Sequence, residues 1–211
     1  MENSMSEETD IFEVIFNCRA MRRIKPDPVP EELLIKLIDA GNHAPTGSNV
    51  QNVRWVIVRN PEQKRLLAEE NRRHITAYMA ADRVEELPHH SKEKRDRMRE
   101  AVVWQMEHMH DIPALVIACL EFSEPQTEPA RAGGGGYVWP AVQNVLLAAR
   151  ALGLGATPTT LGLRDRDRVK EILHLPETVE AYCLVPIGYP MGNFGPVTRL
   201  PVETTLHWDH W

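Results

Sequence analysis

Residues 140–156, which read PAVQNVLLAARALGLGA, decide the fold. They predict a nearly uncharged helix over Tyr137–Leu152 that is apolar on most sides and therefore central and buried. Gly153 and Gly155 follow it, as is typical of a helix C-terminus. This pair also begins like a dinucleotide-binding fingerprint. Pro158 stands where the third glycine is needed, however, and the pair follows a helix rather than a strand, so the Rossmann interpretation fails.

Shorter elements surround this helix. Strands are predicted where β-branched and apolar residues run together, at Val53–Val58, Ala114–Phe122 and Ala181–Ile187. Amphipathic helices are predicted at Ile11–Cys18, Glu31–Ala40, Pro61–Met79 and Arg166–Leu173. The elements follow no regular βαβ rhythm, which favours an α+β fold with a core built mostly from helices.

Composition limits the function classes. The 211 residues suit a single domain over 1–211, and the net charge of −6 argues against a protein that binds nucleic acid. The longest clean apolar run, Ala114–Leu120, is too short to cross a bilayer, so no membrane partner is expected. Three scattered cysteines favour a reduced, cytoplasmic setting.

Several chemistries lack their motifs. The sequence contains no Walker loop and no nucleophile elbow. His108, His110 and Asp111 do not have the spacing of a metal site and are expected to be solvated, so no metal is predicted. The glycine run 133–136 has no following Lys-Ser/Thr and is better explained as a loop than as a phosphate cradle.

Four polar segments remain as candidates for a binding site. Arg19, Arg22 and Arg23 lie within five residues, and arginine suits bidentate phosphate binding, although a solvated basic turn explains them equally well. The loop 44–51, the segment 157–161 after the central helix, and Arg199 near the end complete the set. Taken singly, each is explained as well by a loop or turn.

Together these segments resemble the nitroreductase family of FMN-dependent oxidoreductases. The resemblance rests on five motifs in order: RAMRRIKPDPVPEELL at 19–34, APTGSNVQ at 44–51, PAVQNVLLAARALGLGA at 140–156, IGYP at 187–190 and RLP at 199–201. It implies an α/β/α sandwich with a central, mostly antiparallel sheet. It also implies a homodimer with FMN at two interface sites, and NADH or NADPH as reductant.

The resemblance also implies which residues bind the flavin. Arg19 and Arg22 would hold the phosphate and ribityl chain within the motif Arg19, Ala20, Met21, Arg22 and Arg23, and Arg199 would close on the same phosphate. The partner subunit would reach the flavin through Pro45, Thr46, Gly47 and Asn49. The backbone of Thr159, Thr160 and Leu161 would lie beside the ring, with an N–H facing its N5 atom.

Departures from the family pattern concern the same site. Cys18 and Ala20 stand where the family often has arginine and serine, and Asn52 and Val53 replace a usual Pro-Trp pair. These changes leave open an alternative function, in which the chain is a dimer that only binds or sequesters flavin. The main expectation is a ping-pong NAD(P)H oxidoreductase for nitroaromatics, quinones or similar acceptors, with dehalogenation, ene reduction and flavin fragmentation as alternatives.

Two further segments carry expectations. The charged excursion 80–110 is expected to cover the open face of the flavin as a lid, with Tyr78, Trp104, Met106, His108 and Met109 as candidate lining residues, or alternatively to pack onto the body. The end of the chain, with Trp208 and Trp211, is expected to wrap the other subunit, since aromatic residues suit an interface anchor.

Overall fold

The computed structural model describes residues 10–80, 90–127 and 135–211. A four-stranded sheet lies at the centre in the order β1-β2-β4-β3. Its strands are Val53–Val58 (β1), Ala114–Glu121 (β2), Gly155–Ala156 (β3) and Val179–Gly188 (β4). Every neighbouring pair is antiparallel, as the resemblance implies.

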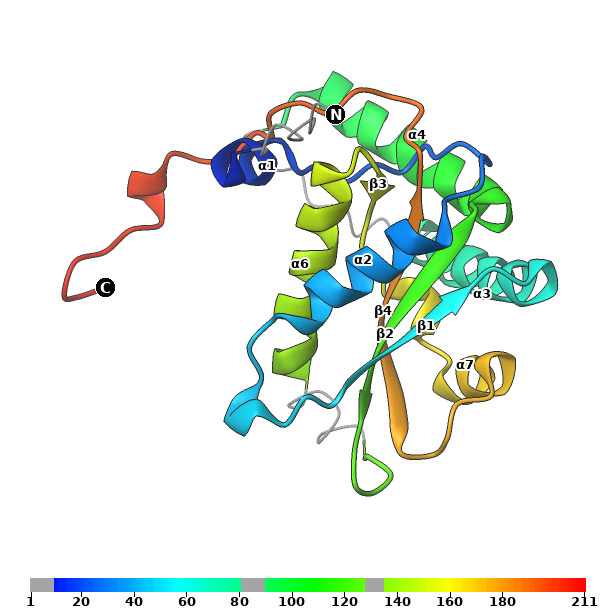
Figure 1. The fold of residues 1–211 in the computed structure, drawn as a ribbon. Coiled ribbons are helices and arrows are strands. Elements are labelled where there is room, and N and C mark those ends of the chain that lie inside the picture. The colour runs from blue at the N-terminus through cyan, green and yellow to red at the C-terminus, as the bar shows by residue number, and fades with distance from the viewer. Residues whose placement is uncertain (1–9, 81–89, 128–134) are drawn as a thin grey trace, which may run out of the picture.

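Helices cover both faces of this sheet (Figure 1). On one face lie α2 and α6, and on the other α3 and α7. The helices are Ile11–Asn17 (α1), Glu31–Asn42 (α2), Pro61–Ala80 (α3), Lys92–His108 (α4), Val138–Ala151 (α6) and Arg166–Leu173 (α7). Single 3-10 turns stand at Gly47–Asn49, Met109–Asp111, Gly135–Tyr137, Leu161–Leu163 and Val202–Thr204. The expected α+β sandwich is confirmed.

Strand β2 divides the core in two because alternate side chains point to opposite faces. Leu115 and Ile117 join the cluster under α3 and α7, whereas Val116 and Leu120 join the cluster under α2 and α6. All residues of β4 and all of β2 except the last are buried. The expectation that helices supply most of the core is therefore corrected, because the central strands β2 and β4 contribute buried residues to both clusters.

Most element boundaries agree with the sequence prediction to within two residues. Strand β3 is the exception, because the prediction treated Gly155 as part of a helix end. Gly153 does end α6, with a φ of 72°. Gly155 instead pairs with Gly188 of β4, and two residues are too few to leave a periodic signal.

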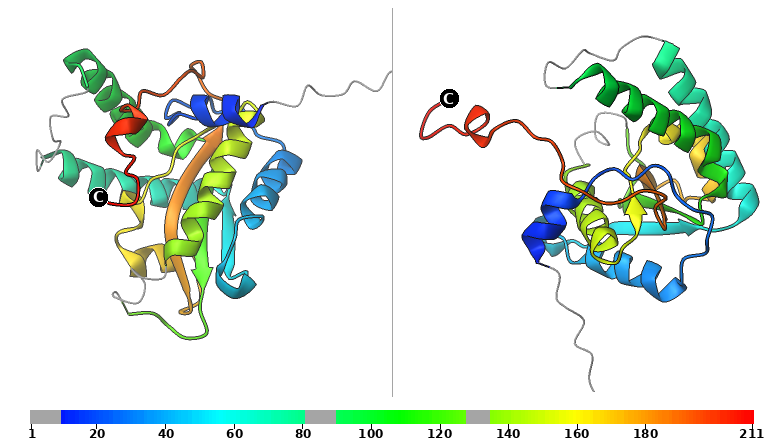
Figure 2. Two further views of the ribbon diagram at one scale, coloured as in Figure 1. Left: turned by 90° about the vertical axis from the view of Figure 1, so that its left-hand side faces the viewer. Right: turned by 90° about the horizontal axis from the view of Figure 1, so that it is seen from above.

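Residues 16–25 and 189–197 lie antiparallel to each other beside β3, whereas the C-terminal segment extends away from the body (Figure 2). Ile24 forms a bridge with Pro190, and the Met191 N–H donates to the Arg23 carbonyl at 2.9 Å. Farther along, the Val197 N–H donates to the Phe16 carbonyl at 3.1 Å. These bonds bring the N-terminal basic motif and residues 189–197 to one side of the molecule.

Glycine makes this close approach feasible. A Cβ on Gly155 would lie 2.7 Å from Ile24 Cδ1 and 3.0 Å from Met21 Cβ, and one on Gly188 would lie 2.5 Å from Ile24 Cγ2. Ile24 and Met21 are buried in the core. The position of the basic motif therefore depends on glycine, which has no side chain, at Gly155 of β3 and Gly188 of β4.

A buried ion cluster fixes α7 to the sheet. Glu180 of β4 is 1% exposed and accepts from Arg166 Nε at 2.9 Å, while Lys170 Nζ lies 3.1 Å from its carboxylate. Burial alone would raise the pKa of Glu180, but the hydrogen bonds from Arg166 and Lys170 outweigh it and hold that pKa below its usual range.

None of the helices in the described ranges is both long and apolar enough to span a membrane.

We predict that Gly155→Ala will lower the free energy of unfolding by about 1–3 kcal/mol, because the new Cβ must displace the strand carrying Ile24. Gly195→Ala is the matched control: no heavy atom lies within 4 Å of its added Cβ, and it should change stability by less than about 0.5 kcal/mol. Urea denaturation measures both. Equal effects would contradict the close-approach argument.

We predict that Glu180→Gln will lower the free energy of unfolding by about 3 kcal/mol at pH 7, because Arg166 and Lys170 lose a buried, charged partner. A depressed carboxyl pKa gives stability that is present above the unfolded pKa of about 4.3 and is lost as pH falls through the folded value. The difference in the free energy of unfolding between the wild type and the variant should therefore become smaller below about pH 4.

Denaturation midpoints across this pH range test the second prediction. Glu177→Gln is the control, since Glu177 contacts the same Lys170 but its side chain is 81% exposed, and it should cost less than about 0.5 kcal/mol. A gap that stays constant with pH would show that Glu180 acts through packing rather than charge.

Candidate functional site

The basic motif lies beside β3, held there by the bond from the Met21 N–H to the Ala156 carbonyl at 3.1 Å. Arg19 is exposed, Ala20 is exposed and Arg22 is half-buried, whereas the Met21 side chain packs into the core. Burial lowers the pKa of Arg22. Arg23 is the member that has a carboxylate nearby, Glu100 of α4 at 3.7 Å.

Arg199 lies two residues beyond the bond between Val197 and Phe16, and its Nη1 donates to the Thr198 carbonyl at 2.9 Å. Within the described ranges, Arg19, Arg22 and Arg199 form no ion pair with any carboxylate. A half-buried guanidinium without a counter-charge is costly, which favours an anion from outside the chain. The three guanidiniums do not contact one another, and their convergence on one phosphate stays a prediction.

The loop with Pro45, Thr46, Gly47 and Asn49 lies at the far end of α6 from the basic motif (Figure 1). A Cβ on Gly47 would be 2.5 Å from the Tyr137 hydroxyl, at the start of α6. Within one chain this loop is therefore separate from the arginines, and its expected role at the partner's site stays a prediction.

The same loop is strained. Ser48, Asn49 and Gln51 have φ values of 51°, 54° and 49°, in the left-handed region that non-glycine residues rarely adopt. Strain of this kind is concentrated at ligand-contacting loops.

The segment Thr159–Leu161 is anchored from one side. Thr159 exchanges both backbone hydrogen bonds with Leu184 of β4, at 2.8 and 2.9 Å. The following 3-10 turn leaves the N–H groups of Thr160, Leu161 and Gly162 without an acceptor in the described ranges. The resemblance assigns a backbone N–H of Thr159–Leu161 to the flavin N5 atom, and that role stays a prediction.

Two buried polar side chains near this segment lack partners. Asn71 of α3 is fully buried against Gly162, and its Oδ1 and Nδ2 form no hydrogen bond within the described ranges. Thr157 is 1% exposed, and its Oγ1 is likewise unpaired. Unsatisfied buried polar groups are rare in proteins and call for a ligand or water. Sequence reasoning missed Asn71, since one asparagine in an amphipathic helix gives no signal.

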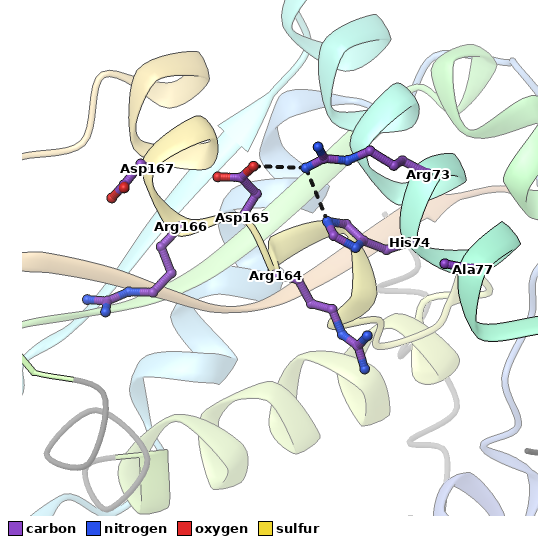
Figure 3. A pocket seen from close by; sticks show the side chains of 7 residues that line it. All are labelled: Arg73, His74, Ala77, Arg164, Asp165, Arg166 and Asp167. Carbon is purple, nitrogen blue, oxygen red and sulfur yellow. Dashed lines mark hydrogen bonds and ion pairs between the residues drawn. The ribbon is translucent and has the colours of Figure 1, made fainter. Parts of the chain in front are cut away.

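A hollow of 680 Å³ opens between α3 and the start of α7 (Figure 3). Its lining includes none of the arginines predicted to bind phosphate. The residues around it are Arg73, His74, Ala77, Arg164, Asp165, Arg166 and Asp167. Asp165 is the N-cap of α7, and its carboxylate accepts from the Arg168 N–H at 3.1 Å.

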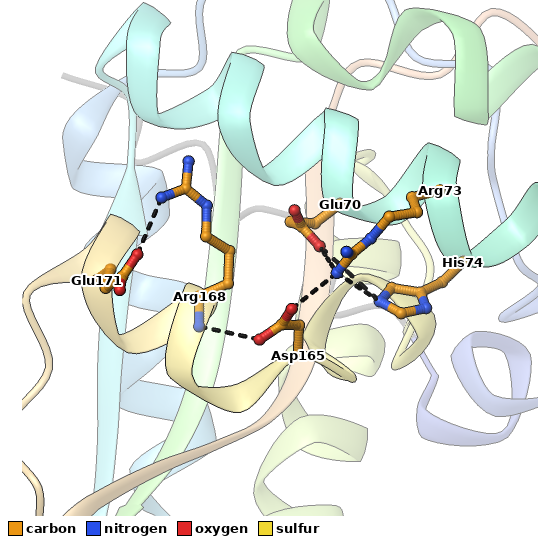
Figure 4. Close-up of polar contacts among 6 residues, drawn as sticks. All are labelled: Glu70, Arg73, His74, Asp165, Arg168 and Glu171. Atoms are coloured by element: carbon orange, nitrogen blue, oxygen red, sulfur yellow. Dashed lines mark hydrogen bonds and ion pairs between the residues drawn. The ribbon is translucent and has the colours of Figure 1, made fainter.

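An ion network ties the two walls of this hollow together (Figure 4). Arg73 Nη2 lies 2.6 Å from Glu70 and 2.8 Å from Asp165. The hydrogen bond from Arg73 lowers the pKa of Asp165, and the Arg168 N–H adds to this effect. The Asp165 carboxylate therefore stays ionised near neutral pH, and the Arg73 charge is compensated within the chain.

The candidate lid is partly described, since 81–89 lie outside the described ranges. Helix α4 packs along α3, where the Thr76 hydroxyl donates to Met106 Sδ at 3.8 Å. Met109 is fully buried in the core, which removes it from the predicted lining. Trp104 stacks on His108, with ring centroids 4.5 Å apart. The covering role of the excursion 80–110 stays a prediction.

Cysteines and candidate metal ligands add nothing to this site. Cys119 and Cys183 are fully buried, and burial raises the pKa of each thiol to about 12, as expected of packing residues. His108 and His110 are each near Asp111, at 3.3 and 3.5 Å. Across the described ranges, no three histidine, cysteine or acidic side chains gather as metal ligands do.

Comparison with known proteins agrees with the resemblance. The chain is 31% identical over 205 residues to an NADH dehydrogenase of Thermus thermophilus, covering 90% of this chain and 91% of that protein. It is 27% identical to an iodotyrosine deiodinase of Thermotoga neapolitana, covering 85% and 88%. The crystal structure of an oxidized iodotyrosine deiodinase bound to FMN and 3-iodo-L-tyrosine shares the fold, with a TM-score of 0.74 and 24% identity over 96% of this chain and all of that one.

The model of the Nitroreductase family matches residues 15–189, which include the basic motif, the strained loop and the segment Thr159–Leu161. The chain belongs to the nitroreductase family.

Proposed function

We propose that this chain is an FMN-dependent NAD(P)H oxidoreductase that works as a homodimer. One observation carries the proposal: the segments that carry Arg19 and Arg22 and that lead to Arg199 pair through backbone bonds, and within the described ranges no carboxylate pairs with these arginines. The phosphate of FMN is a dianion of the kind that arginines bind through charge-assisted hydrogen bonds.

The residues present fit the rest of the cofactor. When bound, FMN supplies the hydride chemistry between NAD(P)H and an acceptor. The free N–H groups of Thr160, Leu161 and Gly162 suit a hydrogen bond to a ring heteroatom, and Thr159 holds them rigidly on β4. The unpaired amide of Asn71 behind Gly162 is a further polar group beside this segment. The chain's task is to orient the ring and exclude water; it need not supply a general base.

Exposed apolar surface supports the dimer. Helix α1 leaves Ile11, Phe12, Ile15 and Phe16 between 41% and 61% exposed. Trp139 of α6 is 45% exposed, and Trp208 and Trp211 in the C-terminal segment are almost entirely exposed. Exposed apolar groups in such numbers mark an interface. A second copy would cover this surface and bring its strained loop, with Pro45, Thr46, Gly47 and Asn49, to the flavin.

Electron-poor acceptors are the proposed substrates, with nitroaromatics and quinones first. Similarity to iodotyrosine deiodinases over most of the chain makes reductive dehalogenation the second candidate. An acceptor screen of the FMN-loaded dimer, with a nitroaromatic, a quinone and 3-iodo-L-tyrosine, separates the two. Protein that stays colourless after incubation with FMN would contradict both.

We predict that Arg19→Ala and Arg199→Ala will each weaken FMN binding by about 10- to 100-fold, the equivalent of one charge-assisted hydrogen bond. Quenching of flavin fluorescence measures the dissociation constant. Arg59→Ala is the control, since Arg59 is at the end of β1 and contacts Glu31 at 3.3 Å. Unchanged affinity in both site variants would refute the phosphate assignment.

We predict that the double variant Phe12→Asp/Phe16→Asp will be a folded monomer of 24.0 kDa that no longer retains FMN, because charges on α1 cannot be buried against a partner. Light scattering gives the mass, and flavin absorbance gives the loading. The matched variant Phe12→Leu/Phe16→Leu should remain dimeric. A charged variant that stays dimeric would place the interface elsewhere.

A further inference from the structure

The hollow between α3 and α7 lies beside the proposed flavin segment. Its volume is 680 Å³, and it is broadly open to solvent, so it can hold one part of a small molecule rather than enclose the whole. Arg164 directly follows the 3-10 turn, and its backbone N–H donates to the Leu161 carbonyl at 3.3 Å. A ligand in the hollow is therefore next to the backbone that faces the ring.

Three arginines line the hollow, and two of them are compensated. Arg73 pairs with Glu70 and Asp165. Arg166 is committed to the buried Glu180, at 2.5 Å.

Arg164 differs from both, because within the described ranges it forms neither an ion pair nor a side-chain hydrogen bond. In Figure 3, its guanidinium extends on the side lined by His74 and Ala77, while Arg166 and Asp167 point the other way.

The walls around Arg164 are held in place. Asp165 caps α7 and receives Arg73 from α3, so the polypeptide on either side of the hollow is cross-linked by an ion pair. His74 lines the same side with a side chain that is 21% exposed, and Ala77 adds an apolar wall. Asp167, the lining carboxylate without a partner in the described ranges, points away from Arg164 (Figure 3), so the exposed guanidinium of Arg164 is the unpaired charge on the side with His74 and Ala77. This side of the hollow is suited to a ligand that carries one negative group beside an apolar body.

We infer that this hollow binds the anionic group, a carboxylate or a phosphate, of a substrate, with Arg164 as its main contact and His74 beside it. This inference rests on the proposed function, because it assigns the ligand either to the acceptor or to the reductant of that reaction. The anion belongs either to the acceptor, as a carboxylate on an aromatic ring, or to the reductant, as the 2′-phosphate that distinguishes NADPH from NADH. The chemistry of recognition is the same in both.

The experiment compares Arg164→Gln with Arg168→Gln in the FMN-loaded protein. Arg168 is the matched control: it lies on the same helix, pairs with Glu171 at 3.0 Å and does not line the hollow. Acceptor arms use 4-nitrobenzoate and the neutral 4-nitrobenzamide, and reductant arms use NADPH and NADH. Calorimetry with benzoate and with adenosine 2′,5′-bisphosphate measures binding without turnover.

We expect Arg164→Gln to lower kcat/KM for one anionic member, 4-nitrobenzoate or NADPH, by about five- to tenfold, while its neutral or less charged counterpart is unchanged. The calorimetric affinity for the corresponding anion should fall by a similar factor, and 0.5 M salt should abolish the difference. Whichever pair responds identifies the source of the anion.

Two results would overturn the inference. One is an Arg164→Gln variant that matches Arg168→Gln in every arm; the other is an equal loss for charged and neutral partners, which would indicate a structural role. A wild-type protein that takes up no FMN would instead contradict the proposed function. The calorimetric arms would still test the anion site, because the hollow is built from the chain's own residues.

Discussion

The pairing of the two chain ends along β3 is the constraint on which the rest of the site depends. Residues 16–25 and 189–197 lie side by side through backbone bonds, and Gly155 and Gly188 let Ile24 pack against the sheet. This contact joins the segments that carry Arg19 and Arg22 to the segment that leads to Arg199, and the arginine side chains form no bond with one another. Charged side chains on mobile ends would pay a large entropy cost to meet one anion, and the pairing removes most of that cost in advance.

Two of the ion-paired arginines have a structural role. Arg73 and Arg166 each have carboxylate partners and hold α3 and α7 in position. Arg19, Arg22 and Arg164 have none within the described ranges, and they lie on the flank of the basic motif or on the hollow beside the Thr159–Leu161 segment. Arg72, Arg97 and Arg99 on α3 and α4 also lack a carboxylate partner within the described ranges, so the proposed anion contacts rest on the positions of Arg19, Arg22 and Arg164 and not on the missing partner alone.

The sequence predicts the fold better than the site. Long periodic elements such as α3 and α6 leave strong signals, and Asp165 shows its capping role by its type and position. Strand β3 is too short for a signal, and the importance of Gly155 appears only when Ile24 is seen against it. The hollow joins residues 73–77 to 164–167, which are far apart in sequence and ordinary in type, so only tertiary structure brings them together.

A single chain holds only part of the proposed site, and the distribution of strain and exposure explains why. The strained loop around Ser48 lies at the opposite end of α6 from Arg19, so it cannot act on the phosphate flank of its own chain. Strain without a contact to stabilise would be selected against, as would the exposed phenylalanines of α1. The proposed homodimer would account for both features, because a two-fold interface would place each chain's loop against the other chain's basic motif. In that assembly the apolar surface and the incomplete site would have one common cause.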